Sequence, residues 1–174
     1  MLTNIIENLR LMVLETENQV KLTYDIVTEL NMDLLERINS KDDYIDNLKT
    51  TLENDCFSYI HQLDENVDQR YINEIRAIHI IAVNLERIAD YCVNITRQVK
   101  YLSEAAIIHQ FNFGPMFDEI KSALSKVSGV LVSKDLYSAL NICKSEFILD
   151  EHYEDNFTQI LKQVNNSKYA ENLI

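Results

Sequence analysis

The sequence predicts an all-α protein, and three observations support that prediction. The 174-residue chain contains only two glycines and one proline, so few residues interrupt a helix. Apolar residues recur at steps of three and four over long stretches, which is the period of one helix face. No stretch shows the alternation of apolar and polar residues that is typical of a half-buried strand. At this length we expect one compact unit with a sizeable core.

Three helical segments are predicted in the first part of the chain, over residues 3–30, 31–63 and 68–102. Asn31 and Asp33 suit the start of the second segment, because short polar side chains accept hydrogen bonds from free backbone N–H groups there. The third segment is the clearest, since its apolar positions form a continuous seam. That seam consists of Ile75, Ile78, Ala82, Leu85, Ala89, Cys92, Ile95 and Val99.

The chain is predicted to break at Gly114-Pro115 and to restart as two further helices, over residues 116–132 and 135–164. The last of these contains Glu146 and Asp150, which repeat the acid-x-x-x-acid spacing of Asp42 and Asp46. We interpret this self-similarity as a duplication of a three-helix unit, with units at 1–110 and 114–174. The second unit is predicted to be incomplete, because after residues 165–167 only 168–174 remain, which are enough to begin a sixth helix and too few to complete it.

Two pairs of carboxylates are the strongest functional signal. Asp42 and Asp46 lie four residues apart on the second predicted helix, as do Glu86 and Asp90 on the third. Residues with this spacing share one helix face, so each pair costs about 0.2–0.5 kcal/mol unless a cation offsets the repulsion. Both pairs border the predicted apolar face, where acids of neighbouring helices can converge and bind a multivalent metal. The alternative is that they are ordinary solvated acids.

The charge of −12 excludes several classes of function. It repels nucleic acid and anionic lipid, and favours a cation or a basic partner. The sequence shows no signal-peptide profile, and no apolar run approaches the roughly 18 residues of a membrane span. Cys56, Cys92 and Cys143 show no C-x-x-C spacing and fall in apolar helical patterns, so we expect buried free thiols in a reducing cytoplasm.

Catalysis is not expected. The di-iron oxidases of helix bundles need Glu-x-x-His motifs, and no histidine here follows an acid at that spacing. Two glycines do not suffice for a phosphate-binding loop of the usual kind. His79 lies on the carboxylate side of the third predicted helix, where we expect a hydrogen-bonded boundary histidine rather than a metal ligand.

Residues 84–95, Asn-Leu-Glu-Arg-Ile-Ala-Asp-Tyr-Cys-Val-Asn-Ile, resemble the signature of the PhoU family, L-E-R-I-G-D followed by N-I. Residues 42–48, Asp-Asp-Tyr-Ile-Asp-Asn-Leu, are similar to the D-x-x-I-D-x-L motif of the same family. Ala89 replaces the usual glycine and is still small enough for close helix packing. The resemblance covers essentially the whole chain, strongly in the first half and weakly in the second.

The resemblance implies tandem three-helix bundles that regulate phosphate uptake and phosphate-responsive signalling in the cytoplasm without catalysis. It implies a metal ion or multinuclear cluster of iron, manganese, zinc or magnesium on Asp42, Asp46, Glu86 and Asp90, with Asp43 and Asn94 as neighbours. Glu146 and Asp150 would supply half of a second site.

The expected partner is a phosphate transporter ATPase or a sensor histidine kinase. Without a complete sixth helix, an apolar stripe on the fourth and fifth predicted helices has no cover, which predicts a homo-oligomer, most simply a dimer. Two alternatives remain open at this point. In the first alternative the chain is the cytoplasmic domain of a phosphate or sodium-coupled transporter. In the second it is a metal-free helical scaffold.

Overall fold

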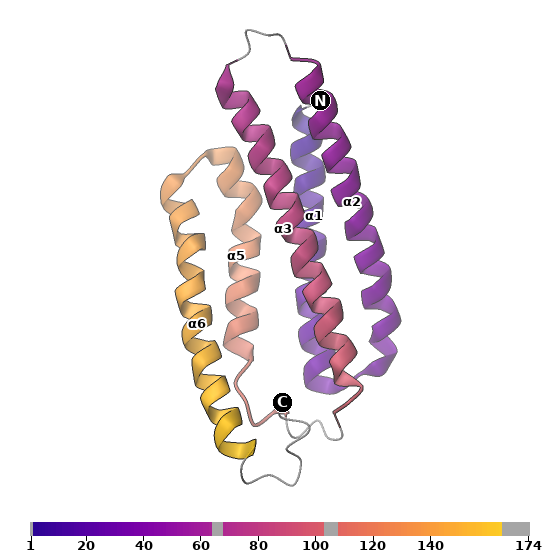
Figure 1. Cartoon of the computed structure of the whole chain (residues 1–174), viewed down its shortest axis with the longest axis vertical. Coiled ribbons are helices and arrows are strands. Elements are labelled where there is room, and N and C mark those ends of the chain that lie inside the picture. Colours follow the sequence, from indigo (N-terminus) through magenta and orange to yellow (C-terminus); the bar gives the residue numbers. More distant parts are fainter. Residues whose placement is uncertain (1, 64–67, 103–107, 165–174) are drawn as a thin grey trace.

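The structure, a computed structural model, describes residues 2–63, 68–102 and 108–164. Within these ranges the chain forms five long helices, a short 3-10 helix and no strand, which confirms the all-α prediction (Figure 1). The long helices are α1 (Leu2–Glu29), α2 (Leu35–His61), α3 (Gln69–Val99), α5 (Gly114–Ser133) and α6 (Leu136–Val164). The 3-10 helix η1 (Met32–Leu34) precedes α2.

Polar caps and backbone breakers place the helix ends close to where the sequence predicts them. The Asn31 side chain accepts a hydrogen bond from the Asp33 N–H at 3.2 Å. Asn31, where the second helix was predicted to start, therefore caps the short helix η1 that precedes α2. Asp68 caps α3 by accepting from the Arg70 N–H at 2.9 Å. Pro115 lies in the first turn of α5, where its missing N–H has no helical partner to lose.

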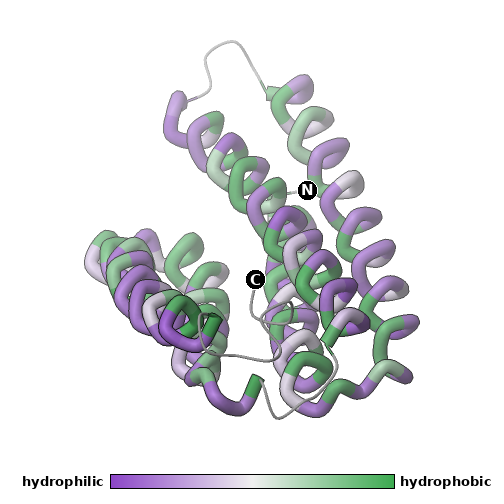
Figure 2. The backbone as a smooth tube through the Cα atoms, turned by 60° about the horizontal axis from the view of Figure 1, so that its bottom comes forward, coloured by the Kyte–Doolittle hydropathy of each residue, from purple (hydrophilic) through white to green (hydrophobic). Residues whose placement is uncertain are grey.

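The α1 helix occupies the centre of the packing. It contacts α2, α3 and α5, and α2 also contacts α3, so the first three helices form a bundle. Wholly buried aliphatic side chains from all three fill it, among them Leu9, Ile26, Ile45, Leu52 and Ile78. In Figure 2 apolar and polar segments alternate along each helix, as amphipathic packing requires.

The second half of the described chain packs against the first half through α5. The α5 helix packs on α1, and α6 packs on α5. Leu124 of α5 belongs to the same hydrophobic cluster as the α1–α3 core. The predicted units at 1–110 and 114–174 therefore share apolar packing across α1 and α5, while the predicted start of a sixth helix at 168–174 lies outside the described residues.

The α6 helix buries little of its apolar surface. Among its described residues only Ser145 and Asn156 are buried. Leu136, Leu140, Phe147, Phe157 and Leu161 are all exposed. Cys143 is exposed as well, whereas Cys56 and Cys92 are buried. The prediction of three buried thiols was thus wrong for Cys143, because no described helix covers that side of α6.

Candidate functional site

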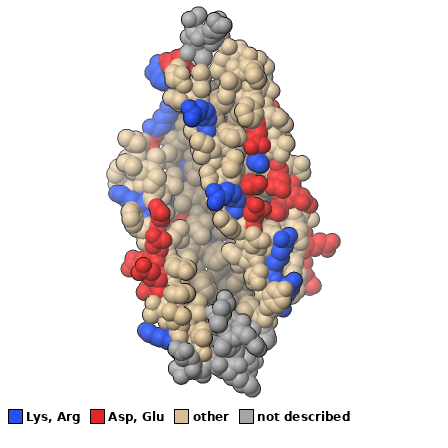
Figure 3. All heavy atoms as spheres, viewed as in Figure 1, with Lys and Arg blue, Asp and Glu red and all other residues tan. Residues whose placement is uncertain are grey.

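The paired acids lie at the margin of the buried faces of α2 and α3. Ile45 and Ala89 are wholly buried and fix the rotation of the two helices. This rotation leaves Asp42 and Glu86 half-buried and Asp46 and Asp90 exposed. The predicted position at the edge of the apolar face is confirmed, and Figure 3 shows acidic atoms gathered over this side of the molecule.

Gln19 of α1 connects these two helices at the level of the acids. Its side chain is wholly buried. The Nε2 atom donates to Asp42 Oδ1 at 3.2 Å and to the Ala89 carbonyl at 3.1 Å. The Oε1 atom has no hydrogen-bond partner within the described structure, which is costly for a buried amide oxygen.

The electrostatics around Asp42 show that acids from both helices act on one another. Burial is the largest cause that raises the pKa of Asp42 above its ordinary value of 3.8. The hydrogen bond from Gln19 opposes this shift, and repulsion from Asp46, Asp90 and Asp43 adds to it. Burial and the neighbouring acids of both helices thus all disfavour the charged form of Asp42.

Glu86 belongs to a different local network. Lys49 of α2 lies 3.8 Å from a Glu86 oxygen and 3.9 Å from a Glu53 oxygen. His79 Nε2 lies 3.1 Å from the other Glu53 oxygen, so the expectation of a hydrogen-bonded boundary histidine is confirmed. An ammonium group therefore occupies part of the space beside Glu86 where a metal was predicted.

The four predicted carboxylates do not form a metal-binding group in the described structure. In the parts of the chain that the structure describes, no three His, Cys, Asp or Glu side chains are grouped closely enough to hold a metal ion. Asp43 and Asn94, the predicted neighbours, are both exposed. The donor chemistry still fits a hard or borderline cation, because the set consists of carboxylate oxygens with the free Gln19 Oε1 nearby.

Glu146 and Asp150, the predicted half of a second site, lie elsewhere. They line an apolar groove of about 1200 Å³ that lies between α3 and α6 and has α5 at its floor. Figure 3 shows this hollow between α6 on the left and α3 in the centre. The described lining contains no other Asp or Glu, so these two carboxylates have no acidic partners there.

The fold and site define a class: an all-α bundle whose neighbouring helices bear four-spaced carboxylate pairs. The chain belongs to the PhoU family, since residues 9–99 match the PhoU domain. That match covers most of α1 and all of α2 and α3, so the resemblance predicted from the motifs is confirmed.

One curated relative extends the similarity into the second half. The chain is similar to a Clostridium acetobutylicum protein described as a phosphate-specific transport system accessory protein PhoU homolog. The two are 24% identical over 156 residues, which span 87% of this chain and 69% of the relative. No solved structure matches the chain significantly, and none of the described helices is long and apolar enough to cross a membrane.

Sequence reasoning missed Gln19 and Lys49. Gln19 stands in the buried stripe of α1, between the buried threonines Thr16 and Thr23. A long amide in the core-facing stripe was the available signal, because such a group requires polar partners from neighbouring helices. Lys49 gave no signal, since its spacing to Glu53 is common on exposed helix faces.

Proposed function

We propose that this protein is a cytoplasmic, non-catalytic regulator of phosphate uptake and phosphate-responsive signalling that acts by protein contact. The supporting observation is the PhoU domain match over α1–α3, together with the carboxylates that those helices carry. The Clostridium acetobutylicum relative is described as an accessory protein of phosphate-specific transport, which agrees with this proposal. The proposed partner is a phosphate transporter ATPase or a sensor histidine kinase.

In this proposal Asp42, Asp46, Glu86 and Asp90 hold a metal ion or cluster of iron, manganese, zinc or magnesium. Binding requires the Glu86 carboxylate to exchange Lys49 for the metal and the exposed acids to rotate toward Asp42. Rotation is open to Asp46 and Asp90, because both are exposed and exposed side chains change rotamer freely. When bound, the metal supplies positive charge that links α2 to α3.

The acidic edge of α2 and α3, once its charges are fixed, is the surface that we propose the partner recognises. Asp43 and Asn94 flank it from the two helices. An acidic surface of this kind favours a partner with a basic patch, since complementary charge accelerates association and selects partners. Glu146 and Asp150 would form a second metal site only if another helix supplied further donors.

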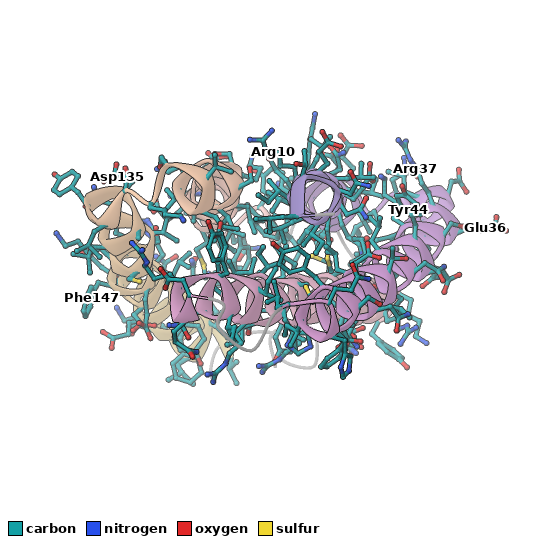
Figure 4. All side chains as sticks on the ribbon, turned by 90° about the horizontal axis from the view of Figure 1, so that it is seen from above. Arg10, Glu36, Arg37, Tyr44, Asp135 and Phe147 are labelled. Carbon is teal, nitrogen blue, oxygen red and sulfur yellow. The ribbon has the colours of Figure 1, made fainter. Side chains whose placement is uncertain are left out.

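We also propose that the protein self-associates through the outer face of the first half of α6. Leu136, Tyr137, Leu140 and Phe147 are exposed there, and Phe147 has 72% of its surface accessible. Figure 4 shows Phe147 on the outer side of α6, at the opposite end of the molecule from Tyr44 of α2. Self-association therefore leaves the acidic edge accessible.

The test measures phosphate control in the native host. A strain that lacks the gene is complemented with wild type, with Asp46→Ala/Glu86→Ala, or with the control Glu151→Ala/Asp155→Ala. The control removes an exposed acid pair of the same spacing from α6. We expect phosphate uptake and a phosphate-repressed reporter to be misregulated in the deletion and in the first variant, and normal with the control. Normal control of both readouts in the deletion strain would contradict the regulatory role.

A further inference from the structure

The groove between α3 and α6 is a second surface, separate from the acidic edge. Its lining comes from α1, α3, α5 and α6 and includes Ile88, Tyr91 and Ile95 of α3. Leu124 of α5 lies at its floor and Leu149 of α6 on its opposite wall. Apolar surface of this extent, exposed to water on one face of a monomer, marks an interaction site.

The dimensions of the groove fit a helix. A helix with its side chains is about 10–12 Å across and rises 1.5 Å per residue. A groove of about 1200 Å³ therefore accommodates about seven to ten helical residues, or two to three turns. The walls are themselves long helices, so an occupant can lie alongside α3 and α6 with apolar side chains toward α5.

The charges of the groove select the kind of helix. Among the described residues that line it, Glu146 and Asp150 are the only charged ones. They lie four residues apart on α6, and neither forms an ion pair with any described residue. Lysine or arginine residues spaced four apart on an occupant would meet both carboxylates.

A second copy of this chain fits the groove poorly. Among the exposed apolar side chains of α6, Leu140, Cys143 and Phe147 lie at helical spacing with Asp150 and Glu154, so apolar and acidic residues share one stripe. Inserting that stripe into another copy's groove would bring acids against Glu146 and Asp150. The charge of −12 on each chain adds to this repulsion.

We propose that the groove binds an amphipathic helix of a partner protein. The apolar face of the partner helix packs against α3 and α5, and its Lys or Arg side chains pair with Glu146 and Asp150. This surface is independent of the metal site proposed above, because neither acid of α6 belongs to the α2–α3 cluster. The protein would then have two ways to bind partners. One is contact through the acidic edge, and the other is a partner helix that lies in the hydrophobic groove.

The probe is a labelled helical peptide of about fourteen residues with one leucine stripe and two lysines four positions apart at the stripe's edge. A matched peptide carries glutamates in place of the lysines. Binding to the full chain is measured by fluorescence anisotropy. We expect the lysine peptide to bind at micromolar concentrations and the glutamate peptide at least tenfold more weakly, with the difference reduced at high salt.

Two variants with matched controls locate the binding. Glu146→Gln/Asp150→Asn should weaken the lysine peptide about twofold to thirtyfold, the range for two exposed ion pairs. Glu151→Gln/Asp155→Asn, on the same helix but outside the groove lining, should have no effect.

The apolar wall is tested in the same way. Ile95→Asn should abolish measurable binding, and because Ile95 is 45% exposed the change spares the fold. The control is Leu14→Asn on α1, which is 52% exposed and outside the groove. Circular dichroism confirms that both variants remain folded.

Four results would overturn the proposal. The first is equal binding of the two peptides, or no binding of either. The second is a glutamate peptide that binds as tightly as the lysine peptide once Mn²⁺ is added, since the α6 acids would then hold a metal. The third is a dimer that binds peptide only after dissociation, which would assign the groove to a second copy. The fourth is binding only after deletion of residues 165–174, which would assign the groove to the chain's own terminus.

Discussion

Asp42→Asn is expected to stabilise the metal-free protein at pH 7. Asparagine preserves the shape of the side chain and an oxygen that accepts from Gln19 Nε2, which lies 3.2 Å from Asp42 Oδ1. The substitution removes the negative charge that faces Asp46 and Asp90. The two larger like-charge contacts, with Asp46 and Asp90, at about 0.2–0.5 kcal/mol each give a gain of about 0.4–1 kcal/mol. For a chain of this size the melting temperature should rise by about 1–4 °C.

The pH dependence of this gain has a defined sign. Because burial raises the pKa of Asp42 above 3.8, the folded protein binds this proton more readily than the unfolded chain does. The cost of the charged form is fully present above the folded pKa and is relieved as the pH falls through it. The stability difference between Asp42→Asn and wild type should therefore shrink as the pH falls from 7 toward 3.8.

The assay is thermal unfolding followed by circular dichroism in chelator, at several pH values. Glu151→Gln is the control, since it removes one exposed charge from α6 and should shift the melting temperature less. Adding Mn²⁺ should reverse the order, because wild type gains a ligand-linked stabilisation that the variant loses. A variant less stable than wild type in chelator at pH 7, or a difference that does not diminish in acid, would refute the reasoning.

Three further predictions concern the core, the thiols and the cation beside the site. Leu52→Ala should lower the free energy of unfolding by about 2–5 kcal/mol in urea titrations, since Leu52 is wholly buried; a loss below 1 kcal/mol would contradict its place in the core. Burial raises the pKa of Cys56 and Cys92 to about 11, so a thiol reagent at pH 8 should label Cys143 rapidly and the other two only on unfolding. Equal labelling rates in the native protein would be inconsistent with the fold. Lys49→Met should increase the stabilisation by Mn²⁺, because it removes the ammonium group that pairs with the α3 glutamate; an unchanged response would show that this lysine does not compete with metal.

The fold could be predicted from the sequence because each helix carries its own apolar period. The steps through Ile45 and Ile78 identify the buried faces of α2 and α3, and both residues are wholly buried. Gly114 and Pro115 mark the start of α5, since their backbone properties act locally. None of this requires knowing which helix lies beside which.

The site could be predicted only in part, because cross-helix partners depend on packing. The sequence places Asp42 and Glu86 at the edge of the apolar faces, and the structure confirms that edge. It does not reveal that Gln19 of α1 reaches Asp42, or that Lys49 approaches Glu86. The prediction that Cys143 is buried was wrong for a related reason. Apolar spacing predicts a face suited to burial, and burial also needs a neighbouring helix to cover that face.

Metal retention by the purified protein tests the central claim most directly. Wild type, Asp46→Ala/Glu86→Ala and Glu151→Ala/Asp155→Ala are stripped with chelator, dialysed against Mn²⁺ or Fe²⁺, desalted and analysed by elemental mass spectrometry. We expect stoichiometric metal on wild type and on the α6 control, and none on the α2–α3 variant. Equal retention by all three proteins, or none by any, would contradict the assignment of a metal site to these carboxylates.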